Sequence, residues 1–201
     1  MKIYPNYGPP APAELSKLKI WDATQLELND NYGDYLLLNA KIIKEAGETH
    51  CSFFTFLSSI LYIGKRKGNR QLQHFKDTFK AIELETEMTE KESAIEELWN
   101  SEDGVIPLEV FPMITSNEAL VHEACMLAAL EPQMLQKSAA VQLANKRNGS
   151  FYDEVLEWSI DQKMKVGTYD LYSCYQIFLH QRQGALKFSN IPESNRVFFQ
   201  P

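Results

Sequence analysis

The sequence predicts an α+β fold in which helices flank a small, mainly antiparallel three-stranded sheet. Short apolar runs of strand length stand next to turn residues, as at Tyr35–Leu38 and Ile60–Ile63. Later segments instead carry apolar residues at helical spacing. The 201-residue chain is 44% hydrophobic and 23% charged, which is ordinary for a globular domain.

The first half of the chain supplies two strands and two helices. The first strand follows a turn cluster at Asp30–Asp34, and the second ends in a basic turn expected at residues 64–69. Residues 70–82 fit a helix and residues 89–100 an acidic helix. The apolar face of the first helix consists of Leu72, Phe75, Phe79 and Ile82.

The next segment supplies a third strand and a long helix. Val105–Ile114 is expected at an edge of the sheet, because its two prolines cannot donate backbone hydrogen bonds. Ser116 can cap a helix that runs to about Leu130, and Pro132 is expected to end it.

The chain divides into three predicted parts. Residues 1–29 are rich in proline and alanine near their start and form a loosely ordered arm. Residues 30–155 form the main domain. Residues 156–201 form a helical extension packed on the core, and the helices expected near the C-terminus lie at 151–160 and 168–182.

Charge is unevenly distributed. The net charge of −7 is unfavourable for a nucleic-acid enzyme, because phosphate binding needs a positive surface. Residues 65–80 nevertheless contain six basic residues and one acidic residue, whereas residues 83–103 contain nine acidic residues and one lysine. A basic patch beside an acidic helical segment is compatible with local phosphate binding.

Several classes of protein are disfavoured. Three widely separated cysteines without a CxxC pair predict reduced thiols and no zinc site. No apolar run approaches the roughly 18 residues of a membrane span, and the first residues lack the apolar core of a signal peptide. We expect an intracellular protein, nuclear or cytoplasmic, with no membrane partner; the sequence leaves its oligomeric state open.

Arg70 and His74 lie one helical turn apart, just after the expected basic turn. At about 100° per residue they share a side with Asp77, roughly opposite the apolar face of the helix. A guanidinium and an imidazole in this arrangement can hold a phosphate and transfer a proton. An ordinary solvated helix face is the alternative.

Glu123 falls within an apolar stripe formed by Leu120, Ala124 and Leu127. A carboxylate at this place is costly unless it is paired or bound to a metal. Glu123 is therefore a candidate metal ligand, although a carboxylate at the edge of the stripe that reaches water, or that pairs with His122 or a lysine, remains the alternative.

Taken in order, these residues resemble the GIY-YIG endonuclease family. Gly33-Asp34-Tyr35 is similar to the family's first tripeptide, and Tyr62-Ile63-Gly64 to its second. Asn145–Gly149, followed by an aromatic pair, adds a likeness to the nuclease domain of animal ankyrin-and-LEM-domain endonucleases. The resemblance covers about residues 30–155. Asp34 departs from the family pattern, which usually has an apolar residue there.

The resemblance implies hydrolysis of phosphodiester bonds in nucleic acid, DNA rather than RNA, with Mg²⁺ or Mn²⁺ as the cofactor. The catalytic residues that it implies are Tyr35, Tyr62, Arg70, His74, Glu123 and Asn145. Glu123 would bind the metal. The basic residues expected to bind nucleic acid are Lys65, Arg66, Lys67, Lys146 and Arg147.

Two other interpretations stay open. A catalytically inactive GIY-YIG-fold module that binds nucleic acid or serves as a scaffold would fit the net acidity and the unusual Asp34. An acidic protein-interaction domain using residues 83–103 would explain the charge, but it would leave Glu123 unexplained.

Overall fold

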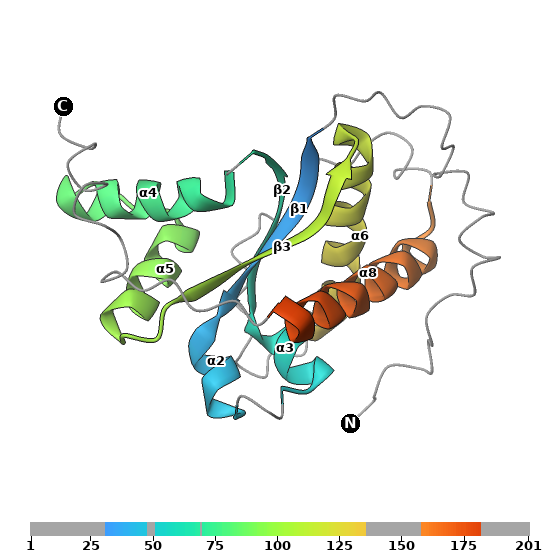
Figure 1. The fold of residues 1–201 in the computed structure, drawn as a ribbon, viewed down its shortest axis with the longest axis horizontal. Helices are drawn as coiled ribbons and strands as arrows, with labels where there is room; N and C mark the ends of the chain where they lie inside the picture. Colours follow the sequence, from blue (N-terminus) through green and yellow to red (C-terminus); the bar gives the residue numbers. More distant parts are fainter. Residues whose placement is uncertain (1–30, 48–50, 69, 136–157, 182–201) are drawn as a thin grey trace.

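The computed structural model describes residues 31–47, 51–68, 70–135 and 158–181. The predicted N-terminal arm lies outside these residues. The described strands are β1 (Tyr32–Asn39), β2 (Ile60–Lys67) and β3 (Val105–Ile114). They form one sheet in the order β2-β1-β3, with both pairings antiparallel (Figure 1). This confirms the predicted fold class and the edge position of the third strand.

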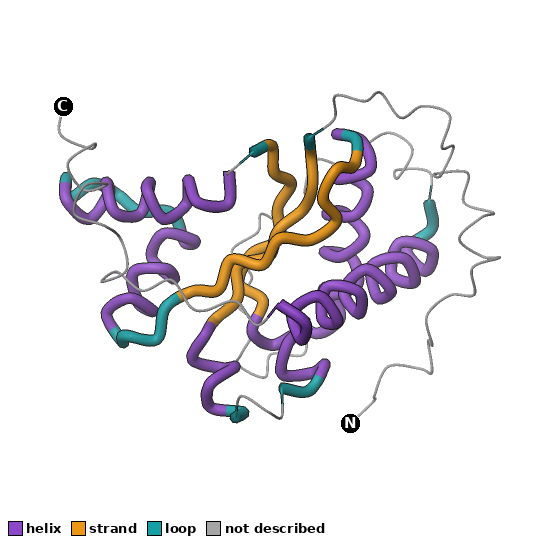
Figure 2. The backbone as a smooth tube through the Cα atoms, in the orientation of Figure 1, coloured by secondary structure: helices purple, strands orange, loops and turns teal. Residues whose placement is uncertain are grey.

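Helices cover both faces of the sheet. Figures 1 and 2 show α4 and α5 on one side of the strands, and α6 and α8 on the other. The described helices are α2 (Ala40–Glu45), α3 (Phe53–Ser59), α4 (Arg70–Glu83), α5 (Glu90–Asn100), α6 (Ser116–Leu135) and α8 (Ile160–Gln181).

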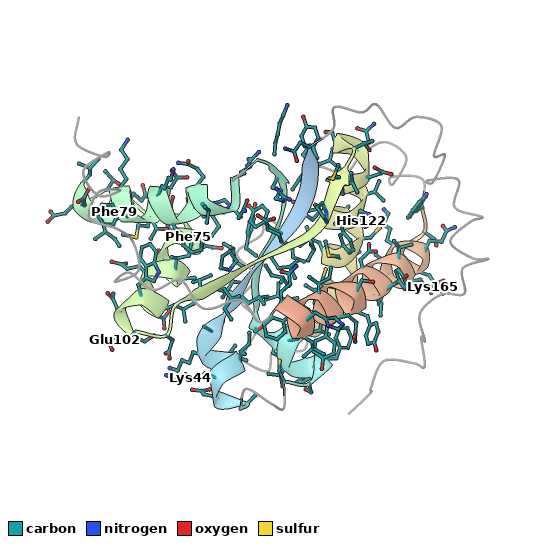
Figure 3. The ribbon with its side chains drawn as sticks, viewed as in Figure 1. Lys44, Phe75, Phe79, Glu102, His122 and Lys165 are labelled. Carbon is teal, nitrogen blue, oxygen red and sulfur yellow. The ribbon has the colours of Figure 1, made fainter. Side chains whose placement is uncertain are left out.

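The central strand β1 contributes to two separate apolar cores, because successive side chains of a strand point to opposite faces. Leu36 and Leu38 pack with residues of α3, α6 and α8. Tyr35 and Leu37 pack with residues of α4 and α5. In Figure 3 the labelled phenylalanines of α4 and His122 of α6 accordingly lie on opposite sides of the sheet.

Strand β2 is longer than the sequence predicts. Gly64 lies inside the strand, opposite Tyr35, and the pairing continues to Lys67 opposite Tyr32. The expected basic turn over residues 64–69 is therefore wrong for its first four residues. Backbone pairing with β1 outweighs the turn preference of a glycine followed by polar residues.

Helix α6 differs from its prediction at both ends. Thr115 rather than Ser116 caps it: Glu118 N donates to Thr115 Oγ1, and Thr115 N donates to the Glu118 carboxylate. The helix also continues past Pro132 to Leu135. A proline lacks one hydrogen-bond donor and strains the preceding turn, but a packed helix can continue through it.

The last described element of the chain is one long helix. Helix α8 begins at Ile160, earlier than the expected 168, and it packs along α6. Residues 151–157 of the other expected helix lie outside the described residues, and the three-part division of the chain stays a prediction. All three cysteines are free and buried. In the described ranges no helix has the length and apolar character needed to cross a membrane.

Candidate active site

Three aromatic side chains meet where β1, β2 and α4 come together. Tyr35 of β1 forms a hydrogen bond through its hydroxyl with Nε2 of His74 on α4. The ring centroids of Tyr35 and Tyr62 lie 5.9 Å apart, and those of Tyr62 and His74 lie 5.2 Å apart. The structure thus brings together both tyrosines and the histidine that the sequence singled out.

Gly64 makes this approach possible. Its position lies opposite Tyr35 in the β1–β2 pairing. A Cβ atom at Gly64 would lie 2.6 Å from Tyr62 Cε1 and 2.8 Å from the Tyr35 hydroxyl oxygen. The glycine of the second tripeptide therefore leaves room for the two phenols, and the tight turn expected from the sequence is not its role.

The buried side of α4 holds Phe75 and Phe79 as predicted, but it also includes His74. His74 is only 8% exposed, whereas Leu72 is 36% exposed, so the expectation that His74 faces away from the core is wrong. The sheet presents polar groups here, and α4 packs polar side chains against them. Gln71, one of these, donates a hydrogen bond to Glu109 of β3.

Burial favours the neutral forms of all three groups. It raises the pKa of Tyr35 and, to a smaller extent, that of Tyr62. Burial, and then the positive charge of Lys91, lower the pKa of His74 to about 4. A neutral phenol therefore faces a neutral imidazole, and the tautomer of His74 decides which of the two donates.

Glu123 approaches the same place from α6. The backbone N–H of Lys65, on edge strand β2, donates to the Glu123 carboxylate. Burial raises the pKa of Glu123, while this hydrogen bond and the charges of Lys65 and Arg70 act in the opposite direction. The carboxylate in turn raises the pKa of both phenols, so it lies within electrostatic reach of Tyr35 and Tyr62.

Arg70 connects these groups electrostatically. It is the first residue of α4, directly after β2, and its side chain is exposed. Its positive charge lowers the pKa of both phenols and of His74, and helps to keep Glu123 ionised. Five of the six expected catalytic residues therefore share one electrostatic environment; the sixth, Asn145, lies outside the described residues.

Glu123 is the carboxylate whose charge acts on both phenols. Among the described residues, no group of three or more His, Cys, Asp or Glu side chains could hold a metal ion. Mg²⁺ keeps several waters and is commonly bound by one or two carboxylates together with substrate phosphates. The Glu123 carboxylate fits a metal held in that way and does not fit a metal held by protein ligands alone.

The basic residues expected to bind nucleic acid differ in their contacts and in their exposure to solvent. Lys65 Nζ donates to Ser116 Oγ at 2.9 Å, and Lys67 Nζ lies 5.1 Å from the centre of the Tyr32 ring. Arg66 is 8% exposed, and its guanidinium lies 3.3 Å from the Glu109 carboxylate. Arg66 is thus engaged inside the protein and is not the solvent-facing cation that the sequence suggests. Lys146 and Arg147 lie outside the described residues.

A buried ion pair next to Glu123 escaped the sequence reasoning. His122 Nδ1 lies 2.9 Å from Asp170 of α8, and both side chains are buried. Burial alone would lower the pKa of His122, but the charge of Asp170 and its hydrogen bond raise it to about 9. The sequence offers one indication of this pair, the position of His122 next to Glu123. It gives none of the partner, Asp170, which lies 48 residues further along the chain.

Asp34, the unusual residue of the first tripeptide, belongs to the same buried region. It is fully buried, and neither carboxyl oxygen has a hydrogen-bond partner within the described part of the chain. Burial raises the pKa of Asp34 well above its ordinary value, although the nearby positive charge of His122 opposes this effect. Burial therefore favours the neutral form of this carboxyl group.

Comparisons with known proteins identify the family to which the chain is similar. The family model for the LEM-3-like GIY-YIG domain matches residues 32–193. An ankyrin repeat and LEM domain-containing protein 1 homolog of Caenorhabditis elegans is 28% identical over 165 residues, which cover 80% of this chain and 22% of that protein. Ankyrin repeat and LEM domain-containing protein 1 of Mus musculus is 26% identical over 164 residues, which cover 78% and 29%.

The chain spans less than a third of the length of these relatives. No solved structure matches it significantly. The family match nevertheless covers most of the chain, including both tripeptides and the residues that converge around Tyr35. The chain belongs to the LEM-3-like GIY-YIG domain family.

Proposed function

We propose that this chain is a metal-dependent endonuclease that hydrolyses phosphodiester bonds of nucleic acid, with DNA as the preferred substrate and Mg²⁺ or Mn²⁺ as the cofactor. The observation that carries the proposal is the convergence of Tyr35, Tyr62 and His74 with a cation, Arg70, and a carboxylate, Glu123. Membership of a nuclease family supports the same chemistry.

Two side chains of opposite charge would hold the reacting groups. The exposed guanidinium of Arg70 binds the scissile phosphate and offsets the negative charge that develops on it. Glu123, whose carboxylate accepts a backbone hydrogen bond from Lys65, would hold the metal ion with its remaining lone pairs. A bound Mg²⁺ or Mn²⁺ would supply positive charge that stabilises the scissile phosphate and the leaving oxygen.

Proton transfer would run through Tyr35. With His74 in the tautomer that leaves Nε2 unprotonated, the Tyr35 hydroxyl donates to Nε2, and its oxygen can accept a proton from the attacking water as its own proton moves to the imidazole. His74 alone is a weak acceptor, because its pKa is about 4. A bound phosphate adds negative charge nearby, which favours the protonated imidazole.

A second candidate function is a GIY-YIG-fold module that binds nucleic acid without cutting it. The observation that favours it is the net charge of −7. This reading makes no use of the hydrogen bond between Tyr35 and His74 or of a partly buried Glu123. Location inside the cell, in the nucleus or cytoplasm, remains part of either proposal.

The test is cleavage of labelled branched, single-stranded and duplex DNA and RNA, with Mg²⁺, Mn²⁺ or EDTA. Wild type is compared with Glu123→Gln, which removes one negative charge at the site. The matched control is Glu118→Gln, a change of equal charge on the same helix that keeps a side chain able to complete the cap with Thr115.

We expect metal-dependent cutting by wild type and by Glu118→Gln, and a loss of at least about 100-fold in Glu123→Gln. The midpoint of thermal unfolding should also rise with Mn²⁺ in wild type and not in Glu123→Gln. Cutting by Glu123→Gln at the wild-type rate would contradict its role. Binding without cutting by every protein would establish the non-catalytic module.

A further inference from the structure

Helix α5 contributes a cation to the site that the sequence reasoning passed over. Lys91 Nζ lies 4.5 Å from the centre of the Tyr62 ring. The side chain is half-buried, and its charge is the largest electrostatic influence on His74. Lys91 therefore acts on two residues of the site, Tyr62 and His74, from a helix that is otherwise strongly acidic.

The position of Lys91 is built into the start of α5. Thr89 caps the helix through a capping box with Glu92, in which each side chain bonds the other residue's backbone N–H. Lys91 lies between these two residues, so the cap fixes the backbone from which its side chain extends. The ring of Tyr62 then supports the aliphatic stem and the ammonium group.

The ion pairs among the described residues include neither Lys91 nor Arg70. Each of these two charges acts on His74, and Lys91 experiences the charge of Arg70 as well as the opposing charges of Glu92 and Asp77. Like charges held close together, one of them partly buried, are unfavourable unless an anion joins them.

We propose that Lys91 is a further substrate-binding residue, whose ammonium group binds a phosphate of the strand that Arg70 holds. The inference rests on the proposed function, because it assumes that nucleic acid enters this site. The nine acidic residues of the 83–103 segment would repel a phosphate backbone. Lys91, the single lysine of that segment, is therefore the place at which a nucleic-acid strand can lie against α5.

The experiment measures binding separately from cleavage. Anisotropy of a fluorescein-labelled, branched duplex DNA gives Kd for the full chain in EDTA, where metal-dependent cutting cannot occur, over a series of KCl concentrations. Lys91→Met keeps an apolar stem over the Tyr62 ring and removes the charge. Lys91→Arg keeps the charge, and Lys41→Met removes one from an exposed position on α2.

A lost phosphate contact lowers the slope of log Kd against log salt concentration by about 0.9 for duplex DNA, or about 0.7 for a single strand. We expect that drop in Lys91→Met alone, with the wild-type slope in Lys91→Arg and Lys41→Met. Unfolding curves confirm that all four proteins are folded.

The outcomes separate the two proposals. Wild-type cutting with an unchanged slope in Lys91→Met overturns the role of Lys91 and leaves the nuclease proposal standing. A Lys91-dependent slope without any cutting in Mg²⁺ or Mn²⁺ keeps the role of Lys91 and overturns the nuclease. Equal drops in Lys91→Met and Lys41→Met, or no salt-dependent binding by wild type, overturn the inference.

Discussion

The hydroxyl of Tyr35 on β1 is hydrogen-bonded to Nε2 of His74 on α4, although the two residues lie 39 positions apart. Both side chains are at least nine-tenths buried. The bond joins the first tripeptide to the helix that follows the second one. It therefore belongs both to the packing of α4 on the sheet and to the proposed chemistry.

Tyr35→Phe tests the chemical role of the hydrogen bond between Tyr35 and His74. The ring stays in the core, but the proton path between water and His74 is lost, so we expect kcat to fall by about 10²- to 10⁴-fold. Leaving the imidazole nitrogen without its donor should lower the free energy of unfolding by about 1–3 kcal/mol. Single-turnover cleavage and urea unfolding measure the two effects. Tyr172→Phe, at an exposed position, should change neither.

His74 should make stability depend on pH in a defined window. Its pKa is about 4 in the folded protein and 6.5 ordinarily, so the unfolded chain takes up the proton first as pH falls. This contribution to stability is complete above pH 6.5 and is lost as pH falls toward 4, by on the order of 2–3 kcal/mol. Unfolding of wild type and His74→Gln, at pH 7 and about pH 4.5, measures it. An equal drop in both proteins would show that His74 does not titrate as expected.

Two glycines should respond differently to alanine. At Gly167 of α8 a Cβ would lie 1.8 Å from the Cys125 carbonyl oxygen of α6, so Gly167→Ala must separate two helix backbones. We expect it to lower the free energy of unfolding by about 3 kcal/mol or more. Gly64→Ala presses on the ends of Tyr62 and Tyr35 instead. It should cost about 1–2 kcal/mol but abolish cleavage, and wild-type cleavage by folded Gly64→Ala would contradict the close-approach argument.

The two buried acidic residues near His122, Asp170 and Asp34, should differ in how much stability their substitution costs. Asp170→Asn removes the partner of a buried positive charge and should lower the free energy of unfolding by about 3–5 kcal/mol at pH 7. Asp34→Asn replaces a carboxyl group whose neutral form burial favours, and its cost should stay under about 1 kcal/mol. Guanidinium unfolding of both variants checks this. A larger loss in Asp34→Asn would mean that Asp34 is ionised and part of the ion pair.

Much of the architecture was predictable because local patterns encode it. Alternation and apolar runs located all three strands, and helical spacing located α4 and α5 to within a residue or two. The cost of a carboxylate in an apolar stripe singled out Glu123, and the two tripeptides indicated the family. Each of these signals spans only a few neighbouring residues.

The tertiary structure decided the rest, because the groups involved come from distant segments. His74 is buried beside the apolar face of α4 only because Tyr35 of β1 meets it with a hydrogen-bonding hydroxyl. Arg66 became a buried cation only because β3 places Glu109 beside it. Lys91 looked like one charge in an acidic helix until the fold set it over the ring of Tyr62. The sequence by itself determined which residues could carry the chemistry, and packing between distant segments decided which of them meet.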